Sequence, residues 1–309
     1  MKMMAGRKHT WKQAGPQKQT ETKRNSKFQE TWGRLKKDKR AVISICGLAF
    51  ILFLAIFADL LANYKETCVV QNLSIMCQKP FLSFDHILGT DAVGRDILGR
   101  IIHGTRIAVL LGFGSVGIAM SIATILGCVA AFFGGLVDQV IMKIIDILAT
   151  LPSMVLAIAI CAGLGNGIWQ LIVALSVGSI AMFTRLVRSK ALSVANMEYL
   201  EAARALGNGT PRIIGKYMIP NIVSIILINA AGNVAGNILM GATLSFIGLG
   251  VKSPTPEWGS MLTEGLGYFM VYPHLVIIPG IALWFTALSI NTFGDCLRDA
   301  MDPHLKGKS

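Results

Sequence analysis

Charged residues are scarce in this chain, and they avoid its long apolar stretches. Only 15% of the 309 residues are charged, whereas 53% are hydrophobic, and the mean hydropathy is +0.58. A water-soluble core does not need so much apolar surface, so the composition excludes an ordinary soluble domain. It is typical of a protein that crosses a membrane several times.

Clusters of metal-ligating or catalytic side chains are also missing from the sequence. The five histidines lie far apart, with no ligand cluster near any of them: His9, His86, His103, His274 and His304. The six cysteines do not have the spacing of a metal site. No paired catalytic residues fall at matching depth in the apolar runs, which disfavours an intramembrane enzyme. We therefore expect no metal site and no catalytic site.

Two glycine-rich patterns resemble nucleotide-binding motifs but lack essential parts. Residues 112–117 match the dinucleotide fingerprint, yet they lie inside an apolar run with no preceding strand. Close helix packing explains these glycines better. Residues 209–217 resemble a phosphate loop, but with one residue too many and with Tyr217 where Ser or Thr must hold magnesium. The sequence thus predicts neither a nucleotide site nor a bound cofactor in this chain.

Six apolar runs approach or exceed the roughly 20 residues that a membrane-spanning helix needs. They cover residues 41–62, 106–133, 147–165, 168–190, 220–247 and 274–295. Pro152 lies within the third run, and Pro279 predicts a kink in the sixth. The fold class is therefore all-α integral membrane, with six transmembrane helices. Residues 63–105 form an external loop after the first span, and residues 106–305 form the core domain.

Basic residues predict the orientation of the chain. Residues 1–40 carry thirteen Lys and Arg against three acids, whereas residues 63–105 balance four basic residues with four acidic ones. Segments rich in Lys and Arg tend to stay in the cytoplasm, so the N-terminus is predicted to be cytoplasmic. An even number of spans, six, then places the C-terminus in the cytoplasm as well. We expect the 1–40 tail to be largely disordered and attracted to anionic membrane lipid. It leads directly into an apolar span, which disfavours nucleic-acid binding.

A short amphipathic segment at residues 197–220 interrupts the apolar runs. Asn196 can cap a helix there, Glu198 and Glu201 suit its first turns, and Gly207 suits a left-handed end. Thr210–Pro211 then predicts the start of a second helix. The residues at helical spacing that predict one apolar face are Tyr199, Ala202, Ala203 and Leu206. A helix–turn–helix on the cytosolic face would dock another molecule.

Three asparagines recur at intervals of four in the fifth run. Asn229, Asn233 and Asn237 form a polar stripe on one helix face, beside Gly232 and Gly236, which would allow close helix approach. Polar groups at this depth either bind neighbouring helices or line a watery path. The three asparagines are our candidates for a translocation path, and the helix-binding alternative stays open.

The external segment contains two further features. The first is a set of charged residues that could form ion pairs with one another: Asp91, Arg95, Asp96 and Arg100. They would lie along a solvated helix that leads into the second span. Cys68 and Cys77 could form a disulfide in an oxidising compartment, although two free thiols would give the same sequence.

The segment from Glu201 resembles the EAA loop of ATP-binding-cassette importer permeases. Glu201-Ala202-Ala203, Gly207 and Pro220 match, whereas Tyr217 and Ile219 replace the usual Ile and Leu. Further blocks resemble the C-type, or second-subunit, branch of the oligopeptide/dipeptide/nickel permease family. They lie at 88–96, 134–152, 244–250, 254–259 and 297–303. The resemblance runs in order from about residue 35 to residue 305.

This resemblance implies a type I importer permease with six transmembrane helices in a bacterial plasma membrane. Its partners would be a homologous second permease, forming a heterodimer, two ATPase subunits that use ATP and magnesium, and an extracytoplasmic substrate-binding protein. The helix at 197–206 would be a cytosolic coupling helix seated in the ATPase. The ATPase-coupling residues would be Glu201, Ala202, Ala203, Gly207, Tyr199 and Leu206.

The resemblance also implies a cargo of di- or oligopeptides. Nickel, free or chelated, is an alternative within the same family. An ion-coupled secondary transporter is an alternative from a different class, and it would need intramembrane carboxylates and broken helices at the midplane. Apart from Asp146, at the start of the third run, acids are absent from the middle of the predicted spans. The chain itself is not expected to be an enzyme.

Overall fold

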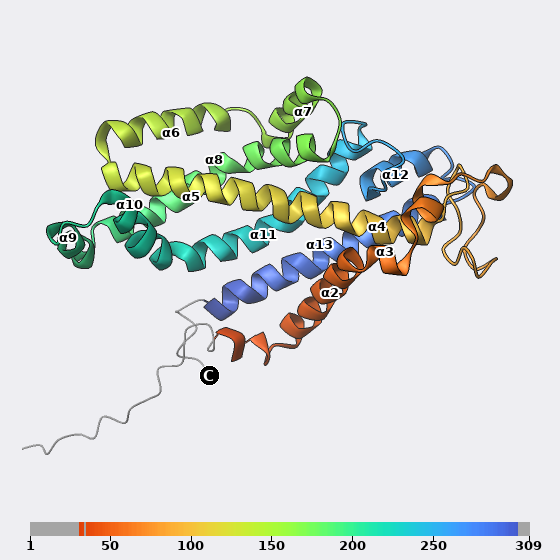
Figure 1. Cartoon of the computed structure of the whole chain (residues 1–309), viewed down its shortest axis with the longest axis horizontal. Coiled ribbons are helices and arrows are strands. Elements are labelled where there is room, and N and C mark those ends of the chain that lie inside the picture. The colour runs from red at the N-terminus through yellow and green to blue at the C-terminus, as the bar shows by residue number, and fades with distance from the viewer. Residues whose placement is uncertain (1–30, 34, 302–309) are drawn as a thin grey trace, which may run out of the picture.

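The computed structural model describes residues 31–301 except residue 34, so the predictions for most of the 1–40 tail lie outside the described residues. Long helices run roughly side by side in an elongated bundle (Figure 1). Within the described residues, extended pairing is limited to one isolated bridge between Thr90 and Asp96. The predicted all-α membrane fold is confirmed.

Five helical segments are long and apolar enough to cross a membrane. Three are single helices: α2 (Lys39–Ile56), α8 (Ile168–Ala195) and α13 (His274–Met301). Ile97–Phe133 joins α4 (Ile97–Val109), the π-helical turn η3 (Leu110–Gly114) and α5 (Ser115–Phe133). Thr210–Phe246 joins α10 (Thr210–Ile213), the π-helical turn η4 (Ile214–Met218) and α11 (Ile219–Phe246). Each joined segment begins before its predicted apolar run, at Ile97 instead of 106 and at Thr210 instead of 220.

The third apolar run is not one helix, so the prediction of a continuous span over 147–165 is wrong. Helices α6 (Gly135–Ala149) and α7 (Ser153–Leu164) meet at an angle of 84°. Pro152 precedes α7 with an extended ψ of 134°. Proline lacks a backbone N–H and disfavours helical geometry in the residue before it, which explains the break. Counting this bent pair as one span gives six spans.

The shorter elements gather at the two ends of the bundle (Figure 1). The α12 helix and the loop before α4 lie at one end, whereas α9 and the turn between α5 and α6 lie at the other. These shorter elements are α3 (Ala58–Leu61), η1 (Lys65–Val69), η2 (Leu73–Ile75), α9 (Glu198–Ala205) and α12 (Trp258–Leu266). The start of α2 and the end of α13 point toward the end that carries α9.

Small residues bring the central helices close together. A Cβ atom on Gly127 of α5 would lie 2.8 Å from the backbone nitrogen of Arg188 in α8. A Cβ on Gly112 of η3 would lie 2.6 Å from Cγ1 of Ile238 in α11. Such contacts leave no room for a side chain, and they account for close helix association in a membrane. Gly112 therefore serves helix packing, whereas Gly117 of the same pattern borders open space.

Two ion pairs fasten α6 to α8. Both guanidinium nitrogens Nε and Nη2 of Arg188 donate to the carboxylate of Asp138. Arg185 Nη2 donates to Oδ1 of Asp146 at 2.7 Å, and this pair is more exposed. Both acids of α6 are thus paired with arginines of α8. These pairs hold α6 against α8, although the chain bends by 84° between α6 and α7.

Candidate functional site

The segment predicted to couple the chain to a partner forms a separate two-turn helix, α9. It begins at Glu198, and Met197 takes the N-cap position without a side-chain hydrogen bond. The prediction that Asn196 caps this helix is therefore wrong; Asn196 instead ends α8 as its C-cap. Glu198 and Glu201 lie in the first turn, where carboxylates favour the positive end of the helix dipole.

Gly207 ends α9 in the left-handed conformation that the sequence predicts. Its φ is +75°, and its N–H donates to the carbonyl oxygen of Arg204 at 2.9 Å. The N–H of Asn208 reaches back to the carbonyl oxygen of Ala203 at 3.3 Å, and its side-chain Nδ2 donates to the same oxygen at 2.9 Å. This is the Schellman arrangement, in which glycine avoids the steric cost of a Cβ. The next helix begins at Thr210, one residue earlier than predicted.

The apolar residues of α9 divide between two faces. Leu200 and Ala203 are buried against the bundle. Tyr199 is 39% exposed and Leu206 is 82% exposed, and Glu201 and Ala202 are also exposed. The prediction of one apolar face that includes Ala203 is therefore wrong, because Ala203 packs inward together with Leu200, three residues earlier, whereas Tyr199, Ala202 and Leu206 do not. The outward face leaves large apolar side chains in contact with the surroundings of the chain.

The three asparagines of α11 have different surroundings. Asn229 Nδ2 donates to the carbonyl of Ile225, and Asn233 Nδ2 donates to the carbonyl of Asn229, both at 2.8 Å. These bonds stay within α11. Asn237 Nδ2 instead donates to Ser115 Oγ at 2.8 Å and lies 3.4 Å from Ser179 Oγ. Asn237 therefore joins α11 to the start of α5 and to α8.

A groove of about 300 Å³ lies between α7, α8 and α11. Its lining contains no charged residue, and its polar side chains are Ser153, Ser179, Asn233 and Asn237. Asn229 is not part of this lining. The structure thus brings two of the three predicted pathway residues together with two serines that sequence reasoning did not single out. Amide and hydroxyl groups can both donate and accept hydrogen bonds, and they carry no charge.

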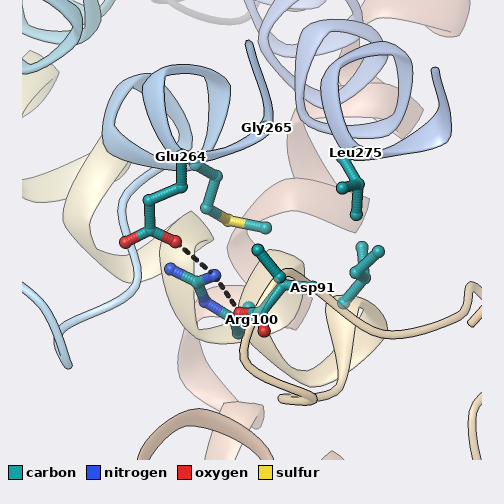
Figure 2. Close-up of a pocket in the computed structure, with 8 residues that line it drawn as sticks. Asp91, Arg100, Glu264, Gly265 and Leu275 are labelled. Carbon is teal, nitrogen blue, oxygen red and sulfur yellow. Dashed lines mark hydrogen bonds and ion pairs between the residues drawn. The ribbon is translucent and has the colours of Figure 1, made fainter. Parts of the chain in front are cut away.

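At the opposite end from α9, a buried cluster of ion pairs joins the loop before α4 to α12. Asp91 Oδ2 accepts from Arg95 Nε at 2.6 Å and also from Arg100 Nη1. Glu264 Oε2 accepts from Arg95 Nη2 and from Arg100 Nη1, each at 2.8 Å. Figure 2 shows Arg100 between Asp91 below and Glu264 above, with Glu264 coming from α12.

The solvated interpretation of this external segment is wrong. Asp91 precedes the helix, and α4 begins only at Ile97, where Asp96 caps it by accepting from the N–H of Gly99 at 2.6 Å. Arg95 is 4% exposed and Arg100 is 1% exposed. The ion pairs therefore form across a loop and a helix end in the interior, not along a wet helix face.

The external end of the bundle also holds two buried thiols and a buried carboxyl. Cys68 and Cys77 are free thiols, and the structure does not contain the disulfide considered for them. Burial raises the pKa of both thiols. Glu257 caps α12 by accepting from the N–H groups of Gly259 at 2.9 Å and Ser260 at 2.8 Å. Burial raises the pKa of this carboxyl, and the two backbone hydrogen bonds oppose the shift.

Comparison with known families identifies the chain. Residues 123–307 match the family described as binding-protein-dependent transport system inner membrane component. Residues 26–80 match the N-terminal TM domain of oligopeptide transport permease C. The chain belongs to this family of transport permeases. It is a multi-pass membrane protein and the permease subunit of a transporter, and the predicted C-type resemblance is confirmed.

Curated relatives align with this permease over nearly its whole length. A dipeptide transport system permease of Alkalihalophilus pseudofirmus is 38% identical over 91% of both chains. A glutathione transport system permease of Pectobacterium atrosepticum is 37% identical over 90% of this chain and 92% of the relative. A di/tripeptide transport system permease of Pseudomonas aeruginosa is 35% identical over 91% of this chain and 93% of the relative.

Proposed function

We propose that this permease carries di- and oligopeptides inward across a bacterial plasma membrane, powered by separate ATPase subunits. The observation that carries the proposal is the similarity over about nine-tenths of the chain to permeases named for dipeptides, di/tripeptides and glutathione. All of these named cargoes are small peptides. Nickel, as an ion or a chelate, is the second candidate within the family and is decided by the same experiment.

The groove between α7, α8 and α11 supports a peptide cargo. Its amide and hydroxyl groups, from Asn233, Asn237, Ser153 and Ser179, can exchange hydrogen bonds with peptide N–H and C=O groups. Because no charge lines the groove, peptides with acidic, basic and neutral side chains meet the same lining. Such a path suits a class of cargo that shares a backbone but varies in side chain.

The exposed face of α9 supports docking of an ATPase. Tyr199 and Leu206 present apolar surface, beside the carboxylate of Glu201, at a single end of the bundle. Exposed apolar patches on a defined element mark interaction sites. In the proposed assembly two ATPases bind ATP and magnesium, a homologous second permease completes the pathway, and an external binding protein delivers the cargo. In this proposal ATP is bound and hydrolysed by the partner ATPases.

The arrangement of the ends supports the predicted orientation. The start of α2, the end of α13 and α9 all point to one end, and a single orientation puts them together in the cytoplasm (Figure 1). The cluster around Arg100 and α12 lies on the external side, facing the binding protein.

Uptake measurements decide the cargo. The complete transporter, reconstituted in liposomes with its ATPases and binding protein, is given radiolabelled dipeptide, tripeptide or nickel with ATP inside. We expect ATP-dependent accumulation of peptide and background levels of nickel. Accumulation of nickel without peptide would replace the proposal with the metal alternative, and accumulation driven by an ion gradient without ATP would replace it with a secondary transporter.

Surface substitutions in α9 test the coupling. Changing Tyr199 and Leu206 together to serine removes exposed apolar area without disturbing the buried Leu200. We expect at least a tenfold loss of uptake and of ATPase copurification, with normal amounts of the permease in the membrane. Ser193→Ala, near the end of α8 and also exposed, is the matched control. Normal uptake by the double variant would contradict the docking assignment.

A further inference from the structure

The proposed docking helix and the external cluster are connected by one continuous helical segment. It starts at Thr210, directly after the turn that ends α9, and it runs 37 residues to Phe246. At about 1.5 Å per residue it is about 55 Å long. The α12 segment follows it at the opposite end of the bundle (Figure 1). A displacement of α9 therefore acts on one end of a rod whose other end leads to Glu264.

The two segments that follow this rod, the α11–α12 connection and α12, are attached to the loop before α4 and to α4 itself by charged contacts. Glu264 of α12 accepts from Arg95 and Arg100, each at 2.8 Å. Arg95 Nη1 also donates at 2.7 Å to Oγ of Ser253, in the connection between α11 and α12. Two segments more than 150 residues apart in sequence are thus held together by three donor–acceptor contacts.

The cluster cannot open without leaving charge uncompensated in the interior. Its two arginines are balanced by two carboxylates, and Glu264 is the partly exposed member at 31%. Nε and Nη2 of Arg100 have no partner in the described part of the chain, so this guanidinium depends on Nη1 alone. Removal of Glu264 would leave a buried positive charge, which is strongly unfavourable.

Asp91 cannot replace the missing partner. Its Oδ1 accepts from the backbone N–H groups of Val93 and Arg95, both at 2.9 Å, and its Oδ2 accepts from both arginines. All of its acceptor positions are in use, and these bonds fix its rotamer. The arginines are therefore held in place on the α4 side, ready for the single carboxylate that α12 supplies.

We propose that the Asp91–Arg95–Arg100–Glu264 cluster is a fixed pivot that stays closed throughout the transport cycle. By holding the external end of the rod on α4, it converts a displacement of α9 into a rotation at the level of the groove, instead of a sliding of the whole rod. This inference rests on the proposed function, because it assigns the cluster a part in the ATP-driven movement.

A cross-link distinguishes a pivot from a gate. Ala92, in the loop before α4, and Met261, in α12, line the same cavity of about 10 Å³ beside Arg100. The variant carries Ala92→Cys and Met261→Cys in a background without the six native cysteines, and a short bis-methanethiosulfonate joins the pair through two disulfides that a reducing agent can cleave. We expect the joined complex to retain most of the peptide uptake of its unjoined form. Loss of uptake that a reducing agent restores would show that the cluster must open, and would overturn the proposal.

The charge itself is tested by Glu264→Gln in the same complex. We expect at least a fivefold fall in peptide moved per ATP hydrolysed, while ATP hydrolysis continues, because the far end of the rod is no longer held. Lys252→Gln, which removes an external charge from the same connection, should leave this ratio unchanged. An unchanged ratio in Glu264→Gln would also overturn the pivot.

A distance measurement separates failure of the pivot from failure of the proposed function. Spin labels at Asp85 and Lys252, both exposed, report the separation of the two segments in the complex with and without trapped nucleotide. We expect one unchanged separation. A change would exclude a fixed pivot even if peptide were not the cargo, whereas absent peptide uptake by the unmodified complex would reject the proposed function alone.

Discussion

The guanidinium of Arg204 in α9 lies 4.6 Å from the centre of the Phe132 ring at the end of α5. Together with the buried Leu200, this cation–π contact sets α9 against the bundle while leaving Tyr199 and Leu206 outward. Exposed contacts of this kind contribute about 0.5–1 kcal/mol. Such a contact is strong enough to fix the direction of a two-turn helix, and weak enough for a docked partner to move it.

Replacing the ring tests this attachment. Phe132→Leu keeps an apolar side chain but removes the ring face, so we expect backbone amides of α9 to exchange hydrogen about two to five times faster. Peptide uptake should fall by a similar factor. Phe133→Leu, one residue further on and edge-to-face with Phe132, is the matched control. Equal exchange in both variants would show that Arg204 does not hold α9.

The asparagine stripe predicts a graded series of effects. Asn237→Leu removes the contact with Ser115 and should lower stability by about 1 kcal/mol, the typical scale of interhelical hydrogen bonds. It also makes the groove more apolar, so uptake should decrease. Asn229→Leu loses only a bond within α11 and lies outside the groove lining. Thermal unfolding in detergent and peptide uptake should both rank Asn237→Leu as the more damaging change.

The two ion pairs between α6 and α8 should differ in strength. Arg188 contacts Asp138 through two nitrogens in a mostly buried setting, whereas Arg185 and Asp146 are about half exposed. A double-mutant cycle on Arg188 and Asp138 should give about 1 kcal/mol or more of coupling, and one on Arg185 and Asp146 less than about 0.5 kcal/mol. Unfolding of each variant in mixed micelles supplies the values, and equal couplings would contradict the burial argument.

Glu257 predicts a pH dependence of stability at the external end. Its pKa in the folded protein lies above the ordinary 4.5, so the folded state holds the proton more tightly than the unfolded state. The protonated form therefore adds stability below about pH 4.5, and this contribution is lost as pH rises through the raised pKa. The melting temperature of the wild type should fall relative to that of Glu257→Gln across this window. If the difference in melting temperature between the wild type and Glu257→Gln stays constant from pH 4 upward, the pKa of Glu257 is not raised.

The thiols of Cys68 and Cys77 should be present but unreactive. Both are free and buried, and burial raises their pKa, so the thiolate fraction at neutral pH is small. In a variant whose other four cysteines are changed to serine, a membrane-impermeant maleimide added from outside should label Cys68 and Cys77 slowly in the native protein and rapidly after denaturation without reductant. If denaturation exposes no thiols until a reductant is added, the two cysteines form a disulfide in the cell.

Local signals predict α9 well, because its ends are set by nearby residues. Gly207 marks its end through backbone freedom alone, and the two glutamates mark its start through the helix dipole. Which side of α9 faces inward depends on Phe132, some seventy residues earlier in the chain. Helical spacing identifies the apolar residues of α9, but it does not show which of them face the bundle and which are exposed. For this reason the sequence groups Ala203 with Tyr199 and Leu206, whereas the structure buries it.

The external cluster shows the opposite limit. Asp91, Arg95 and Arg100 are visible in the sequence as an alternating charge pattern, and this pattern suits both a wet helix and a buried network. Glu264 decides between these two interpretations. It lies 164 positions after Arg100, and no sequence motif contains both residues. Burial of charge depends on such a distant partner, so sequence spacing alone could not reveal it.

The groove beside α11 is bordered by α7, α8 and α11 and leaves Met182 and Gly236 at the surface of the chain. One side of any tunnel that uses it must therefore come from a different molecule. A cell that overproduces this polypeptide alone should stay as impermeable to small solutes as before, because an open groove cannot conduct solute until a second protein covers its exposed side.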